Sequence, residues 1–178
     1  GFLHIRDSLF FSKLVKIISE EIGNLFNTEN TSRELQIKNQ TVKNYLSALE
    51  GTFVAKRVNP YFTSTRAEIR KMPKVYFYDT GLRNFIKDLR DFFSISFKER
   101  YDNGALLENF IFSELLKSDF PNINFWRTKD GAEVDFIINY KSNIIPIEIK
   151  VTKLDRPSFS RGVASFVHSR DLRNGASS

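Results

Sequence analysis

Four charged residues in the second half of the chain have the types and spacing of a catalytic site. They are Glu108, Asp135, Glu148 and Lys150, and the last two stand two residues apart in the apolar run I-I-P-I-E-I-K. Carboxylates that converge repel one another unless a cation neutralises them, and Mg²⁺ prefers carboxylate and water oxygens as ligands. We therefore predict that Glu108, Asp135 and Glu148 hold Mg²⁺ or Mn²⁺. Lys150 would orient a water, or help to deprotonate it, for attack on a phosphodiester.

The elements that would position these residues follow from the periodicity of apolar side chains. Gly104 precedes a stretch with helical spacing, in which Glu108 flanks the apolar face. That face would consist of Leu107, Phe110, Ile111 and Leu115. Strand patterns follow at residues 123–128, 132–140 and 144–152, separated by the turn sequences K-D-G and K-S-N, and residues 157–167 resume a helical pattern.

Strand alternation predicts which of these side chains meet. Glu133, Asp135 and Ile137 would share one face of the second strand, and Glu148 and Lys150 would share a face of the third. If the two strands pair as a hairpin around K-S-N, the two acidic faces approach on the same side of the sheet. The preceding helix, packed over that face, would bring the third carboxylate.

Neighbouring polar and aromatic residues have simpler explanations. Glu114 is expected to form a salt bridge, and Glu133 is expected to support the site rather than act in it. Trp126 and Arg127 would be able to stack on or grip nucleic acid. A single Trp within a strand is, however, more often a core residue.

The first half of the chain has the pattern of a winged helix-turn-helix. Residues 9–26 have helical spacing, and Thr31 or Ser32 would cap a short helix. A second helix would run from residue 39 or 40 to Gly51, with Val42, Tyr45, Leu46 and Leu49 facing inward. Strand patterns at residues 52–62 and 74–82 enclose a basic loop. In DNA-binding proteins of this type the second helix enters the major groove and the wing contacts phosphate.

Positive charge gathers in this region of the chain. Between Thr52 and Lys74 there are six basic residues and one acid, which is a reasonable footprint for a phosphate backbone or an acidic protein surface. The predicted nucleic-acid contacts are Lys43, Asn44, Lys56, Arg57, Arg66, Arg70 and Lys71. The second helix has no Arg placed to read guanine. Docking of a protein and non-specific phosphate contact are therefore alternatives to sequence-specific recognition.

Composition excludes several classes of site. The 178 residues contain no Cys and two His, so Cys-ligated metals, thiolate catalysis and a Ser-His-Asp triad are not expected. The absence of Cys also fits a cytoplasmic location, which we expect for this protein. No apolar run approaches the roughly 18 residues needed to cross a membrane. There is no P-loop, and therefore no nucleotide site is expected in this chain. The single Met is Met72, so we expect further residues before Gly1.

Four motifs together carry a family resemblance. The strings Y-F-Y-D-T-G-L, G-x-x-x-E-N-x-x-x-x-E-L, W-R-T-K-D-G-A-E-V-D-F and P-I-E-I-K lie between about residues 30 and 152. They resemble the C-terminal region of a prokaryotic AAA+ ATPase family, in which a winged helix and a domain similar to PD-(D/E)XK nucleases follow the ATPase domain. The resemblance implies that Glu108 is the helix acid, Asp135 the strand acid, and Glu148 with Lys150 the E-x-K pair.

The resulting prediction is an α+β protein of two domains. Residues 1–95 would form the winged helix-turn-helix with its leading helix, and residues 96–178 a restriction-endonuclease-like core with a mixed sheet, incomplete at its C-terminal end. An ATPase domain would precede the chain, DNA would be its ligand, and a partner subunit would be able to cover an open sheet edge. Two alternatives to a DNA-cleaving enzyme remain: a non-catalytic interaction or regulatory module of the ATPase, and a winged-helix transcriptional regulator.

Overall fold

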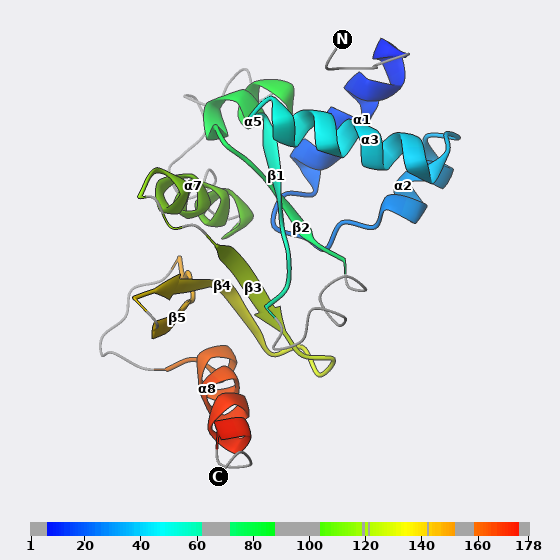
Figure 1. Ribbon diagram of the computed structural model, residues 1–178. Coiled ribbons are helices and arrows are strands. Elements are labelled where there is room, and N and C mark those ends of the chain that lie inside the picture. The colour runs from blue at the N-terminus through cyan, green and yellow to red at the C-terminus, as the bar shows by residue number, and fades with distance from the viewer. Residues whose placement is uncertain are drawn as a thin grey trace. The chain divides into compact units, whose positions relative to one another are not determined.

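The computed structural model shows an α+β chain that divides into two compact units (Figure 1). Unit 1 comprises Gly1–Val58 and Met72–Glu114, and unit 2 comprises Asn59–Lys71 and Leu115–Ser178. The structure describes residues 7–61, 72–87, 104–118, 120, 122–141, 143–151 and 159–174, which contain six helices and two small antiparallel sheets. No helix among these residues has the length and apolarity required to cross a bilayer.

Two sequence predictions fall outside the described residues. The expected domain boundary between residues 95 and 96 is one of them. The tip of the expected basic loop is the other, and it includes Arg66, Arg70 and Lys71.

The first two helices of unit 1 begin at side chains that cap their free backbone N–H groups. The carboxylate of Asp7 accepts from the N–H of Leu9 at the start of α1 (Ser8–Glu20). The side chain of Asn27 does the same for Glu29 and Asn30 at the start of α2 (Thr28–Glu34). The cap predicted at residue 31 or 32 is therefore wrong, because α2 begins earlier and both residues are buried within it.

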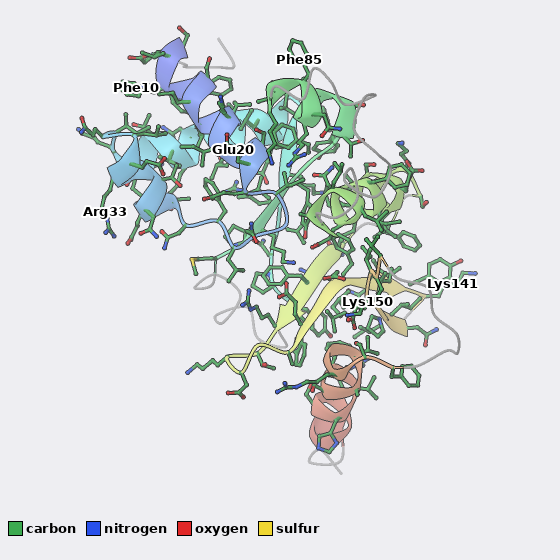
Figure 2. All side chains as sticks on the ribbon, turned by 180° about the vertical axis from the view of Figure 1, so that it is seen from behind. Phe10, Glu20, Arg33, Phe85, Lys141 and Lys150 are labelled. Carbon is green, nitrogen blue, oxygen red and sulfur yellow. The ribbon has the colours of Figure 1, made fainter. Side chains whose placement is uncertain are left out.

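Helix α3 (Asn39–Gly51) confirms the second predicted helix, and its four predicted inward residues are buried. They join the core of unit 1 with the apolar face of α1, which includes Leu14 and Ile18. Strands β1 (Ala55–Val58) and β2 (Lys74–Phe77) pair as an antiparallel two-stranded sheet. Helix α5 (Thr80–Ile86) follows, and it leaves Phe85 at the surface (Figure 2).

Helix α7 (Gly104–Lys117) attaches to β2 through a buried asparagine. The side chain of Asn109 accepts a hydrogen bond from the N–H of Phe77 (2.8 Å) and donates one to its carbonyl (3.0 Å). The ring of Phe112 stacks on Tyr76, with ring centroids 4.8 Å apart. The helix therefore buries one polar side chain in order to satisfy both backbone groups of a strand residue.

The predicted apolar face of α7 is wrong. The buried residues are Leu106, Asn109, Phe112 and Ser113, whereas Phe110 from the predicted face is 44% exposed. Apolar residues occur on nearly every side of this helix, so periodicity alone does not select one face. The hydrogen-bonding requirement of β2 selects it instead.

Unit 2 contains a three-stranded antiparallel sheet in the order β3-β4-β5. The strands are β3 (Ile123–Arg127), β4 (Glu133–Tyr140) and β5 (Asn143–Ile147), and the predicted hairpin between the last two is confirmed. The prediction of a mixed sheet is wrong for the described residues, because every strand pair there is antiparallel and the one parallel contact is an isolated bridge between Pro60 and Phe125.

Helix α8 (Arg161–Asn174) packs against β4 and β5 and completes the core of unit 2 (Figure 1). Phe166 is fully buried there, and the rings of Trp126 and Tyr61 meet it edge-on at 5.4 and 5.8 Å. Trp126 is therefore partly buried and packs against the core of unit 2, as expected of a single Trp within a strand.

Strand β4 carries a β-bulge near its start. The pairs Asn124–Ile137 and Trp126–Val134 are separated by one residue on β3 but by two residues on β4. The extra residue therefore lies in the segment of residues 135 and 136. Bulges of this kind change the direction of the side chains that precede them and are frequent beside active sites.

The bulge overturns the predicted alternation of β4. Strict alternation places Ile137 on the face of Glu133 and Asp135, opposite Val134. Instead, Val134 and Ile137 both pack into the core cluster around Phe166. Asp135 is only partly buried and lines a pocket at the end of the sheet.

Candidate functional site

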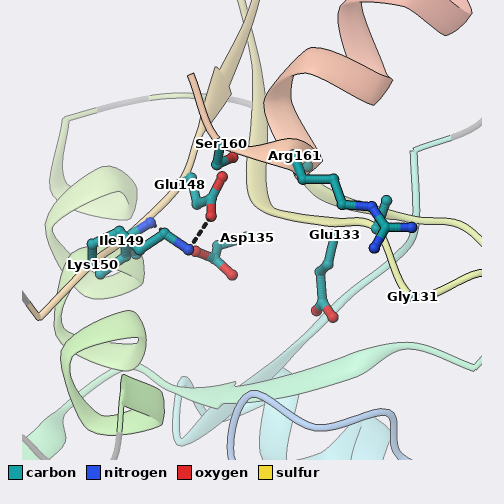
Figure 3. A pocket seen from close by; sticks show the side chains of 10 residues that line it. Gly131, Glu133, Asp135, Glu148, Ile149, Lys150, Ser160 and Arg161 are labelled. Carbon is teal, nitrogen blue, oxygen red and sulfur yellow. Dashed lines mark hydrogen bonds and ion pairs between the residues drawn. The ribbon is translucent and has the colours of Figure 1, made fainter. Parts of the chain in front are cut away.

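A pocket of about 330 Å³ in unit 2 contains three of the four predicted catalytic residues (Figure 3). Its walls come from the beginning of β4, from the residues that follow β5, and from the first turn of α8. The lining residues with functional side chains are Glu133, Asp135, Glu148, Lys150, Ser160 and Arg161. The structure thus brings Asp135, Glu148 and Lys150 together, as the hairpin prediction requires.

Asp135 connects the two sides of this pocket. Its carboxylate accepts a hydrogen bond of 2.7 Å from the backbone N–H of Ile149, the residue between Glu148 and Lys150. The predicted third strand, residues 144–152, is too long, because β5 ends at Ile147. The backbone beyond that point bonds to a side chain of β4, so Glu148 and Lys150 lie beside Asp135 without belonging to the sheet.

Glu148 has one carboxylate oxygen that the protein leaves unsatisfied. Its Oε1 pairs with the ammonium of Lys150, and its side chain is only 15% exposed. Oε2 is buried, and no donor among the described residues reaches it. A buried carboxylate oxygen without a protein partner is costly unless a water, a cation or a hydrogen-bond donor of a ligand satisfies it.

Lys150 is a permanent cation at neutral pH. The hydrogen bond to Glu148 raises the pKa of Lys150 above 10.5, and the negative charges of Glu148 and Asp135 reinforce that shift against a smaller desolvation effect. The side chain of Lys150 is half exposed, so it remains accessible to a ligand.

Arg161 lines the pocket on the opposite side from Lys150 (Figure 3). No acidic side chain in the described part of the chain pairs with its guanidinium. The nearby carboxylate of Glu133 pairs instead with Arg127 at 3.6 Å. Glu133 also lines the pocket, and its supporting role stays a prediction.

Glu108 belongs to unit 1, where it joins a buried network. Its Oε1 lies 2.9 Å from the ammonium of Lys74, which is 3% exposed, and it also accepts a hydrogen bond from the hydroxyl of Tyr76. Across the described segments, no three acidic or imidazole side chains gather closely enough to hold a metal ion. Membership of Glu108 in the metal site therefore stays a prediction.

The donor set of the pocket nevertheless fits a divalent cation. Mg²⁺ keeps several waters and is usually bound by one or two carboxylates together with substrate phosphates. Asp135 and Glu148 provide two carboxylates on adjacent segments, and the unsatisfied Oε2 of Glu148 is an available ligand atom. A cation bound here would have an open coordination sphere for a substrate.

The residues of unit 1 that we predict to contact nucleic acid differ in their solvent exposure and in their ion pairs. Lys43 and Asn44 are exposed on α3, and Lys56 is half buried on β1. Arg57 is paired with Glu50, which neutralises much of its charge. Lys74, counted with the basic region from the sequence, is buried and cannot contact a nucleic acid.

Sequence reasoning missed the contribution of α8 to the pocket. Ser160 accepts a hydrogen bond from the N–H of Val163 (3.2 Å), as a helix cap does. Gly162 lies so close to β4 that an added Cβ would stand 1.8 Å from the carbonyl oxygen of Glu133. A serine before a helix and a glycine within its first turn are recognisable signals, but neither indicates which strand the helix contacts.

Comparison with known proteins identifies two matching families and several relatives. Residues 2–92 match the family described as Domain of unknown function (DUF8612), and residues 103–176 match the Domain of unknown function (DUF4143). Uncharacterized proteins of Mycobacterium bovis and Mycobacterium tuberculosis are each 31% identical over 144 residues, which is 80% of this chain and 32% of theirs. An uncharacterized protein of Haemophilus influenzae is 22% identical over 150 residues, 82% of this chain and 35% of its own.

The chain spans about a third of the length of these relatives. No solved structure matches it at a significant level. The DUF8612 match covers just over half of the chain. The chain therefore belongs to the DUF8612 family, and its C-terminal part is similar to DUF4143.

Proposed function

We propose that this chain binds DNA and hydrolyses phosphodiester bonds with Mg²⁺ or Mn²⁺, as the C-terminal part of an AAA+ ATPase-family protein. The observation that supports this proposal best is the unsatisfied, buried Oε2 of Glu148 beside Asp135 and Lys150 in one pocket. A purely structural acidic residue would be expected to have partners for both oxygens.

The roles of the pocket residues follow from their positions. Asp135 and Glu148 would hold the cation, with Glu108 as the predicted third ligand. When bound, the cation would supply Lewis-acid polarisation of a phosphoryl oxygen. Lys150, fixed by Glu148 and fully protonated, would stabilise negative charge that develops on the phosphate during attack. The Ile149 N–H holds the carboxylate of Asp135 in a fixed orientation.

Unit 1 would supply affinity for DNA. In this proposal α3 would act as the recognition helix of a winged helix, and β1 and β2 would flank its wing; the order α2, α3, β1, β2 supports it. Lys43, Asn44 and Lys56 of unit 1 are available to phosphate oxygens. Residues 66, 70 and 71, which lie outside the described residues and are grouped with unit 2, would add three positive charges.

A cleavage assay tests the proposal directly. The chain, alone and as part of the proposed AAA+ ATPase-family protein, would be incubated with plasmid, linear and branched DNA and Mn²⁺. We expect Asp135→Asn, Glu148→Gln and Lys150→Met to abolish cleavage, while Asp130→Asn, in the exposed β3–β4 turn, retains it. Cleavage that persists in Asp135→Asn and Lys150→Met would refute the site.

A non-catalytic interaction module is the second candidate function. It is favoured by the structural use of the carboxylates, because Glu108 satisfies Lys74 and Tyr76, and Asp135 satisfies the Ile149 N–H. This candidate predicts that Mn²⁺ leaves the melting temperature unchanged. A Mn²⁺-dependent rise in melting temperature that disappears in Glu148→Gln would exclude it.

A further inference from the structure

Two side chains of the pocket in unit 2 are placed to take a partner of opposite charge. The buried Oε2 of Glu148 has no donor among the described residues, and the solvent-exposed Arg161, on the other side of the pocket, forms no ion pair with them. We propose that Arg161 binds the phosphate group of the nucleic-acid substrate, opposite Lys150. This inference rests on the proposed function and extends it to a residue that no sequence motif indicated.

The charges of the pocket restrict the ligand that Arg161 can take. Three carboxylates line the pocket, those of Glu133, Asp135 and Glu148, so a bare anion would be repelled. A phosphodiester that enters together with a divalent cation would suit both sides of the pocket. The cation would bind the carboxylates, and the phosphate oxygens would accept hydrogen bonds from the guanidinium of Arg161. Arginine suits this contact since its planar fork can donate two parallel hydrogen bonds to one phosphate.

Two contacts hold the backbone around Arg161 in place. They support the proposed contact between its guanidinium and a substrate phosphate. Ser160 caps the first turn of α8 through the N–H of Val163. Gly162 brings that turn into direct contact with the backbone of Glu133 on β4. The backbone of Arg161, between Ser160 and Gly162, is therefore held in place at the pocket wall. Only the side chain of Arg161 has to move in order to contact a substrate.

DNA binding under non-cleaving conditions tests this inference. Fluorescence anisotropy with a labelled duplex in Ca²⁺, over a series of KCl concentrations, would compare the wild-type chain with Arg161→Gln, Arg161→Lys and Arg170→Gln. Arg170 lies on the same helix and does not line the pocket. We expect Arg161→Gln to weaken binding about tenfold and to reduce the salt slope by about 0.9. Arg161→Lys should keep the slope with a smaller loss, and Arg170→Gln should match the wild type.

A second measurement separates failure of this inference from failure of the proposed function. The rise in melting temperature with Mn²⁺ depends on Asp135 and Glu148, so Arg161→Gln should retain it in full. If the wild type shows the Mn²⁺ response but Arg161→Gln binds DNA with wild-type affinity and salt slope, the role of Arg161 is refuted and the metal site stands. If the wild type shows neither the Mn²⁺ response nor DNA binding, both proposals are refuted together.

Discussion

Asp135 and Ile149 are joined by a hydrogen bond of 2.7 Å from the Ile149 N–H to the Asp135 carboxylate. The bond lies just beyond the last residue of β5, Ile147, where the ladder with β4 has ended. It therefore replaces a backbone contact and places Glu148 and Lys150 on either side of the connected residue. Asp135 has two separable properties, an acceptor oxygen and a negative charge.

Substitutions at Asp135 should separate these two properties. Asp135→Asn keeps an oxygen for the Ile149 N–H, whereas Asp135→Ala leaves that donor without its acceptor. We expect the free energy of unfolding to change by less than about 0.5 kcal/mol for Asn and to fall by at least about 1 kcal/mol for Ala, measured by urea denaturation. Both variants should lose the Mn²⁺ response. Equal losses of stability would show that the hydrogen bond contributes nothing.

Gly162→Ala should loosen α8 from the sheet. The new methyl group would stand 1.8 Å from the carbonyl oxygen of Glu133, and backbone at that distance cannot yield locally. We expect a loss of about 1–3 kcal/mol in the free energy of unfolding. Gly51→Ala is the matched control, because a Cβ there meets nothing within 4 Å and the residue ends helix α3. That variant should be neutral or slightly stabilising, and a neutral Gly162→Ala would contradict the observed close approach.

Glu108→Gln should destabilise unit 1 through Lys74. It removes the charge that neutralises a buried ammonium, and breaking one partner of a buried pair typically costs about 3–5 kcal/mol. The double variant Lys74→Met with Glu108→Leu should recover part of that loss, since no unpaired charge remains. Urea denaturation of the two single variants and the double variant measures the coupling. Full stability of Glu108→Gln together with loss of DNA cleavage would instead assign Glu108 to the chemistry.

Glu21→Gln should stabilise the protein at neutral pH. Partial burial, and the nearby charges of Glu34 and Glu20, raise the pKa of Glu21 above 4.5. A carboxyl whose pKa is raised in the folded state favours folding below its unfolded pKa, and this contribution is lost as the pH rises through the folded value. The residue is exposed, so the gain at pH 7 should be a few tenths of a kcal/mol, about 0.5 at most.

Thermal melting at two pH values checks this expectation. The difference between Glu21→Gln and the wild type should be present at pH 7 and should disappear near pH 3.5, where Glu21 is protonated. Glu29→Gln, an exposed residue in the first turn of α2, is the control and should not stabilise at either pH. A gain for Glu21→Gln that is independent of pH would rule out the electrostatic explanation.

Local sequence patterns were sufficient to predict those features that depend on a single helix or hairpin. Helix α3, its four buried residues and the β4–β5 hairpin all follow from periodicity and turn residues within short windows. The proximity of Asp135, Glu148 and Lys150 was also predictable, because a tight hairpin brings residues at equal distances from its turn together. The buried face of α7 was not predictable from the sequence. It is set by the hydrogen bonds between the Asn109 side chain and the backbone of Phe77, which lies on a strand distant in sequence.

The sequence alone determined the residues that could form a catalytic site and the hairpin that brings Asp135, Glu148 and Lys150 together. Only the tertiary structure decided that β4 bulges at residues 135 and 136, that Glu148 keeps an unsatisfied oxygen, and that Arg161 reaches the same pocket. The physical reason is the separation along the sequence of the residues that make each contact. Hairpin pairing is set by neighbours along the chain, whereas a bulge, a buried orphan atom and a helix seated on a strand depend on contacts between segments far apart in sequence.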